Sequence, residues 1–131
     1  MRVGAKRTMD PSRAVVARTK QSLNYALARL QYSELSPYIC QVFLYGSCAR
    51  KKQTYKSDVD LFVVLKEGID IDKFKAEIIN LKGTVSPTSL NLPEVDMHVT
   101  VGNDWQASNM LYYKNIRKDG VELWERYQKH I

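Results

Sequence analysis

The chain has 131 residues, of which 44% are hydrophobic and 26% are charged, and its formal net charge is +6. We expect one domain with a real hydrophobic core and no second domain that could bind an acceptor. No apolar run approaches the length of a membrane span, and no hydrophobic stretch follows the basic N-terminus, so we expect a cytoplasmic protein without a signal peptide. Cys40 and Cys48 are expected to be free thiols.

The N-terminal third is predicted to be a polar lead-in, residues 1–9, followed by a long helix over residues 10–34. Asp10 suits the N-cap of this helix, and Pro11 is compatible with its first turn. Pro37 prevents the helix from continuing. Apolar residues recur along it at helical spacing, namely Val16, Leu23, Leu27 and Leu30. This stripe indicates a core-packing helix, with a partner-binding face as the alternative.

A strand over residues 40–45 is predicted to lead into the first polar motif of the chain. Gly46 would let a ligand approach the backbone closely, and Ser47 would cap a short helix over residues 48–53. The N-terminus of such a helix offers free amide groups to an anion. Arg50, one turn further on, could then reach a phosphate oxygen.

The second motif is Asp58-Val59-Asp60, which is separated from Ser47 by ten residues. In a strand, residues two apart project from the same face, so Asp58 and Asp60 are predicted to point together. The run over residues 61–65 is apolar throughout and indicates a buried central strand. Two carboxylates at the start of a buried strand repel each other and lose hydration. A divalent cation such as Mg²⁺ or Mn²⁺ would relieve both effects.

The remaining predicted elements alternate between helix and strand. They are a helix over 72–81, a loop over 84–93, a strand over 95–101, a helix over 104–119 and a short apolar segment over 121–124. Gly120 ends the last long helix. This alternation indicates an α/β or α+β domain.

The ordered pair of motifs, Gly46-Ser47 and Asp58-Val59-Asp60, resembles the DNA polymerase β-like nucleotidyltransferase superfamily. In particular, the chain resembles the minimal nucleotidyltransferases that are often encoded beside HEPN-domain proteins. The resemblance covers about residues 38–125, with Lys51 standing where a glycine often follows the arginine. It implies a small mixed β-sheet with helices packed mainly on one face.

The resemblance also implies a set of site residues. Its third carboxylate corresponds best to Asp96, with Glu94 as a possible substitute and His98 as a supporting or packing residue. Two Mg²⁺ ions, or Mn²⁺, would be held by Asp58, Asp60 and Asp96, which are also the expected catalytic residues. ATP is the expected donor substrate, and the nucleotide-binding residues would be Gly46, Ser47, Arg50 and Ser57.

The resemblance leaves several acceptors open. The favoured hypothesis is an antitoxin that transfers AMP to a tyrosine of a HEPN-type partner protein. The alternatives are an aminoglycoside-like small-molecule nucleotidyltransferase and a partner-binding module without catalysis, while a template-directed polymerase would need a domain that grips the primer. The basic residues between the two motifs suit either a solvated face or nucleotide phosphates. No nucleic acid is expected as a direct ligand.

Overall fold

The computed structural model describes residues 11–50, 52, 54, 57–89 and 91–128. At its centre is a four-stranded sheet in the order β3-β2-β1-β4. The strands are β1 (Ile39–Tyr45), β2 (Val59–Leu65), β3 (Val95–Val101) and β4 (Val121–Glu122). Strand β1 is antiparallel to both β2 and β4, whereas β2 and β3 are parallel. The predicted α+β domain with a small mixed sheet is therefore confirmed.

Strand β2 is the buried central strand that its apolar run predicted. Every residue from Leu61 to Leu65 is at most 1% exposed. Alternate side chains serve two different clusters, with Leu61 and Val63 on one face and Phe62 and Val64 on the other. Because residues i and i+2 share a face, Asp60 lies on the Phe62 side of the sheet.

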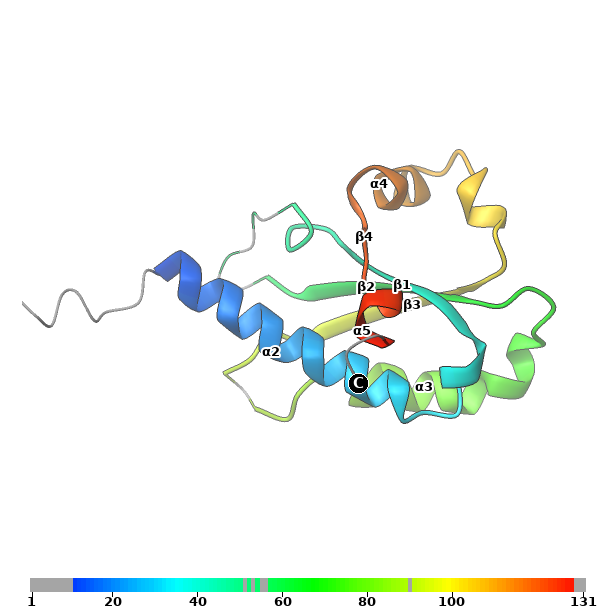
Figure 1. The fold of residues 1–131 in the computed structure, drawn as a ribbon, viewed down its shortest axis with the longest axis horizontal. Coiled ribbons are helices and arrows are strands. Elements are labelled where there is room, and N and C mark those ends of the chain that lie inside the picture. Colours follow the sequence, from blue (N-terminus) through cyan, green and yellow to red (C-terminus); the bar gives the residue numbers. More distant parts are fainter. Residues whose placement is uncertain (1–10, 51, 53, 55–56, 90, 129–131) are drawn as a thin grey trace, which may run out of the picture.

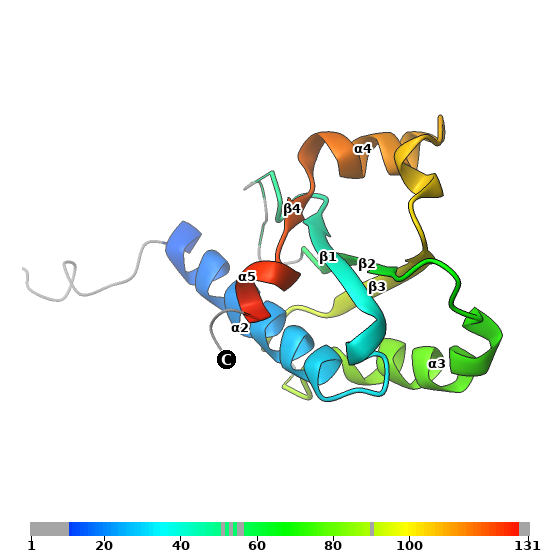
Figure 2. The same ribbon diagram turned by 45° about the vertical axis from the view of Figure 1, so that its right-hand side comes forward.

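Three helices cover the face that carries Leu61. They are α2 (Pro11–Gln31), α3 (Lys75–Thr84) and α5 (Trp124–Gln128). Each contributes buried side chains to the main hydrophobic cluster, including Leu30 from α2, Leu81 from α3 and Trp124 from α5. Figures 1 and 2 show α2 and α3 on the side of the sheet opposite to α4.

The opposite face is covered by the short 3-10 helix η3 (Asp104–Gln106) and by α4 (Leu111–Asp119). Its buried cluster is Phe62, Val64, Trp105 and Ile116, with Phe43, Tyr45, Tyr112 and Tyr113 packed against it. Arg117 fastens η3 to α4, since its guanidinium donates to the carbonyls of Trp105 at 2.6 Å and Ser108 at 2.8 Å. The buried cluster on this face is smaller and more aromatic than the one on the other face.

Two predicted helices differ from the observed ones. The predicted helix over 72–81 begins as a 3-10 turn, η2 (Ile71–Phe74), and continues as α3 to Thr84, so that Gly83 lies inside its last turn. The helix predicted over 104–119 is split, because Met110 has extended backbone angles and α4 begins only after it.

The N-terminal helix is shorter than predicted at its C-terminal end. It stops at Gln31, and the chain turns before the 3-10 helix η1 (Ser36–Tyr38). The Ser33 hydroxyl accepts the Leu35 N–H at 3.2 Å and so stabilises a turn in place of another helical turn. Residues 1–10, with the predicted cap Asp10, lie outside the described residues. Within the described part of the chain, no helix is both long and apolar enough to cross a membrane.

Candidate active site

The sheet brings two of the predicted carboxylates side by side. Asp60 of β2 pairs in register with Asp96 of β3, and on its other side with Tyr45 of β1. All three residues lie on the face that carries α4. Tyr45 packs against the aromatic cluster there, Asp60 is two residues from Phe62 of that cluster, and Asp96 pairs with Asp60. Asp58 lies directly before β2 and is exposed. Asp58 is near Asp60 in the sequence, only two residues away. Asp96 is brought beside Asp60 by the parallel register of β2 and β3.

The electrostatic environment of Asp60 links the three carboxylates. Asp60 is half-buried, and this desolvation is the main cause that raises the pKa of its carboxyl. The negative charges of Asp96 and Asp58 raise this pKa further, while His98 lowers it. The ionised form of Asp60 is thus held at a cost in the absence of a cation.

These carboxylates match a hard divalent cation in their donor chemistry, since carboxylate oxygens are the ligands that Mg²⁺ prefers. Asp60 has no hydrogen-bond donor among the described residues, so its oxygens are available as ligands. The described side chains do not, however, include three His, Cys, Asp or Glu groups that already converge on one metal position. The donor set fits Mg²⁺, but its side chains are not arranged in advance around an ion.

The Gly46-Ser47 segment forms a tight turn beside Asp60. Gly46 has φ +77°, a conformation that favours glycine, and a β-carbon added there would lie 2.5 Å from Oδ2 of Asp60. Glycine is therefore required twice at this position, once for the backbone conformation and once for the close approach of the carboxylate. The two sequence motifs meet directly at this contact.

The short helix predicted over residues 48–53 is wrong for its described residues. Residues 46–50 form a hydrogen-bonded turn, in which the Arg50 N–H donates to the Gly46 carbonyl at 3.2 Å. The next bond, from Lys52 N–H to the Ser47 carbonyl at 2.8 Å, spans five residues. This spacing departs from the four-residue repeat of an α-helix, so the turn does not propagate.

The other two predicted nucleotide-binding residues have different surroundings. The Arg50 guanidinium Nη1 lies 3.9 Å from Oδ2 of Asp119, at the end of α4. The Ser57 hydroxyl accepts the Thr54 N–H at 2.9 Å and so closes a local turn just before Asp58. Ser57 thus stabilises the turn that leads into Asp58.

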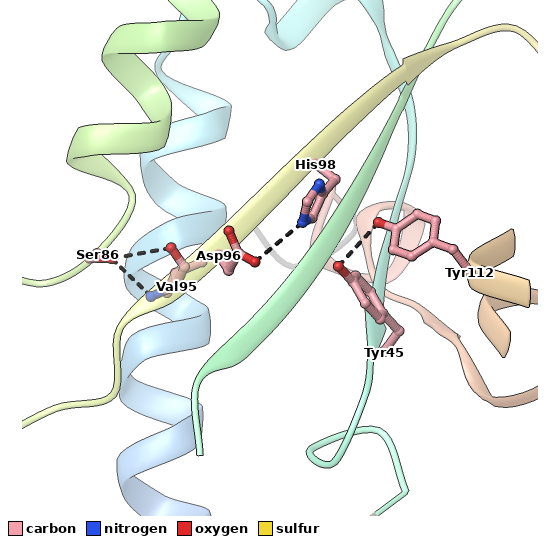
Figure 3. Close-up of polar contacts among 6 residues, drawn as sticks. All are labelled: Tyr45, Ser86, Val95, Asp96, His98 and Tyr112. Carbon is pink, nitrogen blue, oxygen red and sulfur yellow. Dashed lines mark hydrogen bonds and ion pairs between the residues drawn. The ribbon is translucent and has the colours of Figure 1, made fainter. Parts of the chain in front are cut away.

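A polar chain runs from Asp96 toward α4, as Figure 3 shows. Oδ2 of Asp96 is hydrogen-bonded to Nε2 of His98 at 3.2 Å. The His98 ring lies edge-on to Tyr112, with 5.5 Å between the ring centroids. The Tyr112 hydroxyl donates to the Tyr45 hydroxyl at 3.1 Å. Burial is the main cause that raises the pKa of both tyrosine hydroxyls, and the charges of Asp60 and Asp96 add to it.

Sequence patterns gave weak signals for the residues of this chain. Beyond Asp96, the only sequence-based candidate among them is His98, as a supporting or packing residue. Tyr45 and Tyr112 are 67 positions apart, so no local pattern indicates their contact. Glu94 lies before β3, where its carbonyl accepts the Val59 N–H at 2.8 Å. Cys48 is a further residue of the site, since its buried thiol donates to the Asp58 carbonyl at 3.4 Å. Both cysteines are free, as predicted.

A family model described as "Polymerase beta, Nucleotidyltransferase" matches residues 30–129, most of the chain. The chain belongs to this nucleotidyltransferase family. Membership supports general nucleotidyl transfer by this domain. The turn at Gly46 and the carboxylates Asp58, Asp60 and Asp96 all lie within the matched range.

Comparison with curated proteins gave no match. Among solved structures, the chain is similar to a crystal structure from Sulfolobus solfataricus that is provisionally described as a nucleotidyltransferase. The identity is 17%, the TM-score is 0.46, and the match covers 87% of this chain and 83% of the other. The assignment to the family depends on the family model alone.

Proposed function

We propose that the protein is a Mg²⁺-dependent nucleotidyltransferase that transfers AMP from ATP to a hydroxyl acceptor. The observation that carries this proposal is the contact between the two motifs. Gly46 lies directly against the Asp60 carboxylate, and Asp60 lies beside Asp96 in the sheet. The turn that would bind the phosphates therefore lies beside the pair of carboxylates.

Asp58, Asp60 and Asp96 are the residues that would hold Mg²⁺. Bound there, the metal would neutralise the triphosphate and lower the pKa of the acceptor hydroxyl. The raised pKa of Asp60 supports this proposal, because its desolvated carboxylate lies in the field of Asp96 and Asp58, and a cation would offset that repulsion. The turn at Gly46 would hold the phosphates, and Arg50 would add a positive charge near them.

The proposed reaction is a displacement at the α-phosphorus. The acceptor oxygen forms a bond to this phosphorus, the bond to the β-phosphate oxygen breaks, and pyrophosphate leaves. Asp96 accepts the proton of the acceptor hydroxyl, a role open to a carboxylate within hydrogen-bond reach. His98, hydrogen-bonded to Asp96, would keep that carboxylate oriented. Most of the acceleration would come from positioning and charge neutralisation.

We further propose that the acceptor is a tyrosine of a HEPN-type partner protein and that the transfer silences a toxin. Two points support this proposal. The chain resembles the minimal nucleotidyltransferases, and the described residues form one sheet with its helices, without a second domain that could hold a small acceptor. A separate macromolecule would then present the hydroxyl to the exposed side of Asp96.

The test is transfer of label from α-phosphate-labelled ATP, with Mg²⁺, to a co-expressed protein encoded next to this one. The inactive variant is Asp58→Asn combined with Asp60→Asn, and Asp104→Asn on η3 is the matched control. A labelled protein band that disappears only in the double variant supports the proposal. Label that moves to aminoglycosides or RNA contradicts the partner acceptor. If no transfer occurs and the double variant still inhibits the partner, the protein acts as a binding module.

A further inference from the structure

Helix α4 contacts residues on either side of the Gly46-Ser47 pair, one near each end of the helix. Near the start of the helix, the Tyr112 hydroxyl donates to Tyr45, the residue directly before Gly46. At the end of the helix, Asp119 lies 3.9 Å from the guanidinium of Arg50, whose N–H closes the turn on the Gly46 carbonyl. One helix thus contacts both the residue that precedes Gly46 and the residue that closes the turn.

Helix α4 is itself fixed relative to strand β1. Directly after the helix, β4 pairs with β1 at Leu44 and Phe43, the residues that precede Tyr45. Ile116 is 1% exposed against the sheet, and Arg117 ties the helix to η3. The positions of the two contacting side chains are therefore set by strand pairing and by packing that do not involve the turn.

The stability of α4 does not require either contacting group. A carboxylate in the last residue of a helix, as at Asp119, meets the negative end of the helix dipole and is unfavourable there. A phenylalanine would fill the aromatic cluster as well as Tyr112 does, without the cost of desolvating a hydroxyl. Both groups are better explained by what they contact than by the helix that carries them.

We propose that Tyr112 and Asp119 are positioning residues for the nucleotide-binding turn. They act through Tyr45 and Arg50, and they hold the turn beside Asp60 before the nucleotide binds. The proposal rests on the proposed function, because it assigns to the turn the phosphates of ATP. Its consequence is a tighter binding of nucleotide, since less ordering of the turn is left for the binding step.

The test uses Tyr112→Phe, Asp119→Asn and the double variant. Tyr113→Phe is the matched control for the first, because Tyr113 adjoins Tyr112 in the same cluster and no hydrogen bond of its hydroxyl is seen among the described residues. Asp104→Asn is the control for the second. We expect the KM for ATP to rise about fivefold in Tyr112→Phe and roughly twofold in Asp119→Asn, with kcat within about twofold of wild type.

Two further readouts separate positioning from simple stabilisation. Hydrogen exchange of the amides of residues 46–50 should be faster in the double variant than in either control. Asp119→Asn should keep or raise the melting temperature while it weakens nucleotide binding, because it removes an unfavourable charge at the helix end. Asp119→Glu, which keeps the charge, should restore the KM.

The proposal is overturned if the double variant matches its controls in both KM and amide exchange. It is also overturned if kcat falls and KM stays constant. If wild-type protein transfers no nucleotide, the proposed function fails by itself. The positioning role is then decided by amide exchange and by the affinity for a non-hydrolysable ATP analogue, neither of which depends on turnover.

Discussion

The two faces of the sheet are built from the same strands but carry different kinds of side chain. On the face covered by α2, α3 and α5, the strands present only apolar side chains, such as Leu61 and Val63. On the face covered by α4, the same strands present Tyr45, Asp60 and Asp96, with polar groups that are paired or half-exposed. The first face holds the larger buried apolar cluster. The second has a smaller buried cluster and also places like charges side by side, which costs stability.

The largest expected effect is that of Asp60→Asn on the α4 face. In the proposed reaction, transfer should fall by about a thousandfold, because the charge stabilisation that a bound Mg²⁺ would supply is lost. The metal-free variant should nevertheless melt at a higher temperature than wild type, since burial and the charges of Asp96 and Asp58 oppose ionisation of Asp60. Steady-state kinetics and thermal melts measure the two effects, with Asp104→Asn as the control.

The pH dependence of stability tests whether the ionised Asp60 carboxylate destabilises the fold. The folded-state pKa of Asp60 is raised, so the wild-type protein should gain stability relative to the variant as the pH falls through that pKa. That gain is lost again as the pH rises. A variant that melts below wild type at neutral pH would mean that Asp60 stabilises the fold and that the two faces do not differ in this way.

Leu61→Ala tests how much the opposite, apolar face of the sheet contributes to stability. Leu61 is fully buried, so the substitution should lower the free energy of unfolding by about 2–5 kcal/mol. Activity per folded molecule should stay near that of wild type, because the side chain points away from Asp60. Chemical denaturation and kinetics below the melting temperature measure this. A large fall in kcat of the folded variant would show that the faces are coupled.

Gly46→Ala tests the contact between the motifs on the α4 face. The left-handed backbone conformation should cost about 1–3 kcal/mol, and the close approach to Asp60 should cost more. Gly68→Ala is the matched control, because Gly68 has φ +85° and an added β-carbon would meet nothing within 4 Å. The difference between the two variants in denaturant melts and in the KM for ATP measures the contact. Equal destabilisation with equal KM would contradict it.

The smallest effect concerns the reactivity of the two thiols. The reactivity of Cys48 measures how often the turn opens and exposes the apolar cluster against which this residue packs. Cys40 is exposed, whereas Cys48 is 5% exposed and burial raises the pKa of its thiol. A thiol reagent should therefore modify Cys40 quickly and Cys48 slowly, with the slow reaction becoming faster only at higher pH. Cys40→Ser should abolish the fast phase. Fast labelling of both thiols would show that the turn opens readily.

Local patterns in the sequence determined much of the molecule. The apolar run after Asp60 predicted the buried strand, because five successive apolar residues leave no face for water. The spacing of Asp58 and Asp60 placed them near each other, and a glycine before Ser47 indicated close backbone contact. These features depend on residues within a few positions of one another, where strand periodicity and backbone conformation decide the outcome.

Only the tertiary structure decided which distant residues complete the site. Asp96 lies beside Asp60 because β2 and β3 pair in parallel in one register, and the sequence alone does not state the strand order. The Tyr112 contact to Tyr45 depends on how α4 packs across the sheet, and hydrogen bonding over five residues replaced the predicted helix after Ser47. Strand register and helix packing are set by the summed burial of many side chains, which no single local pattern contains.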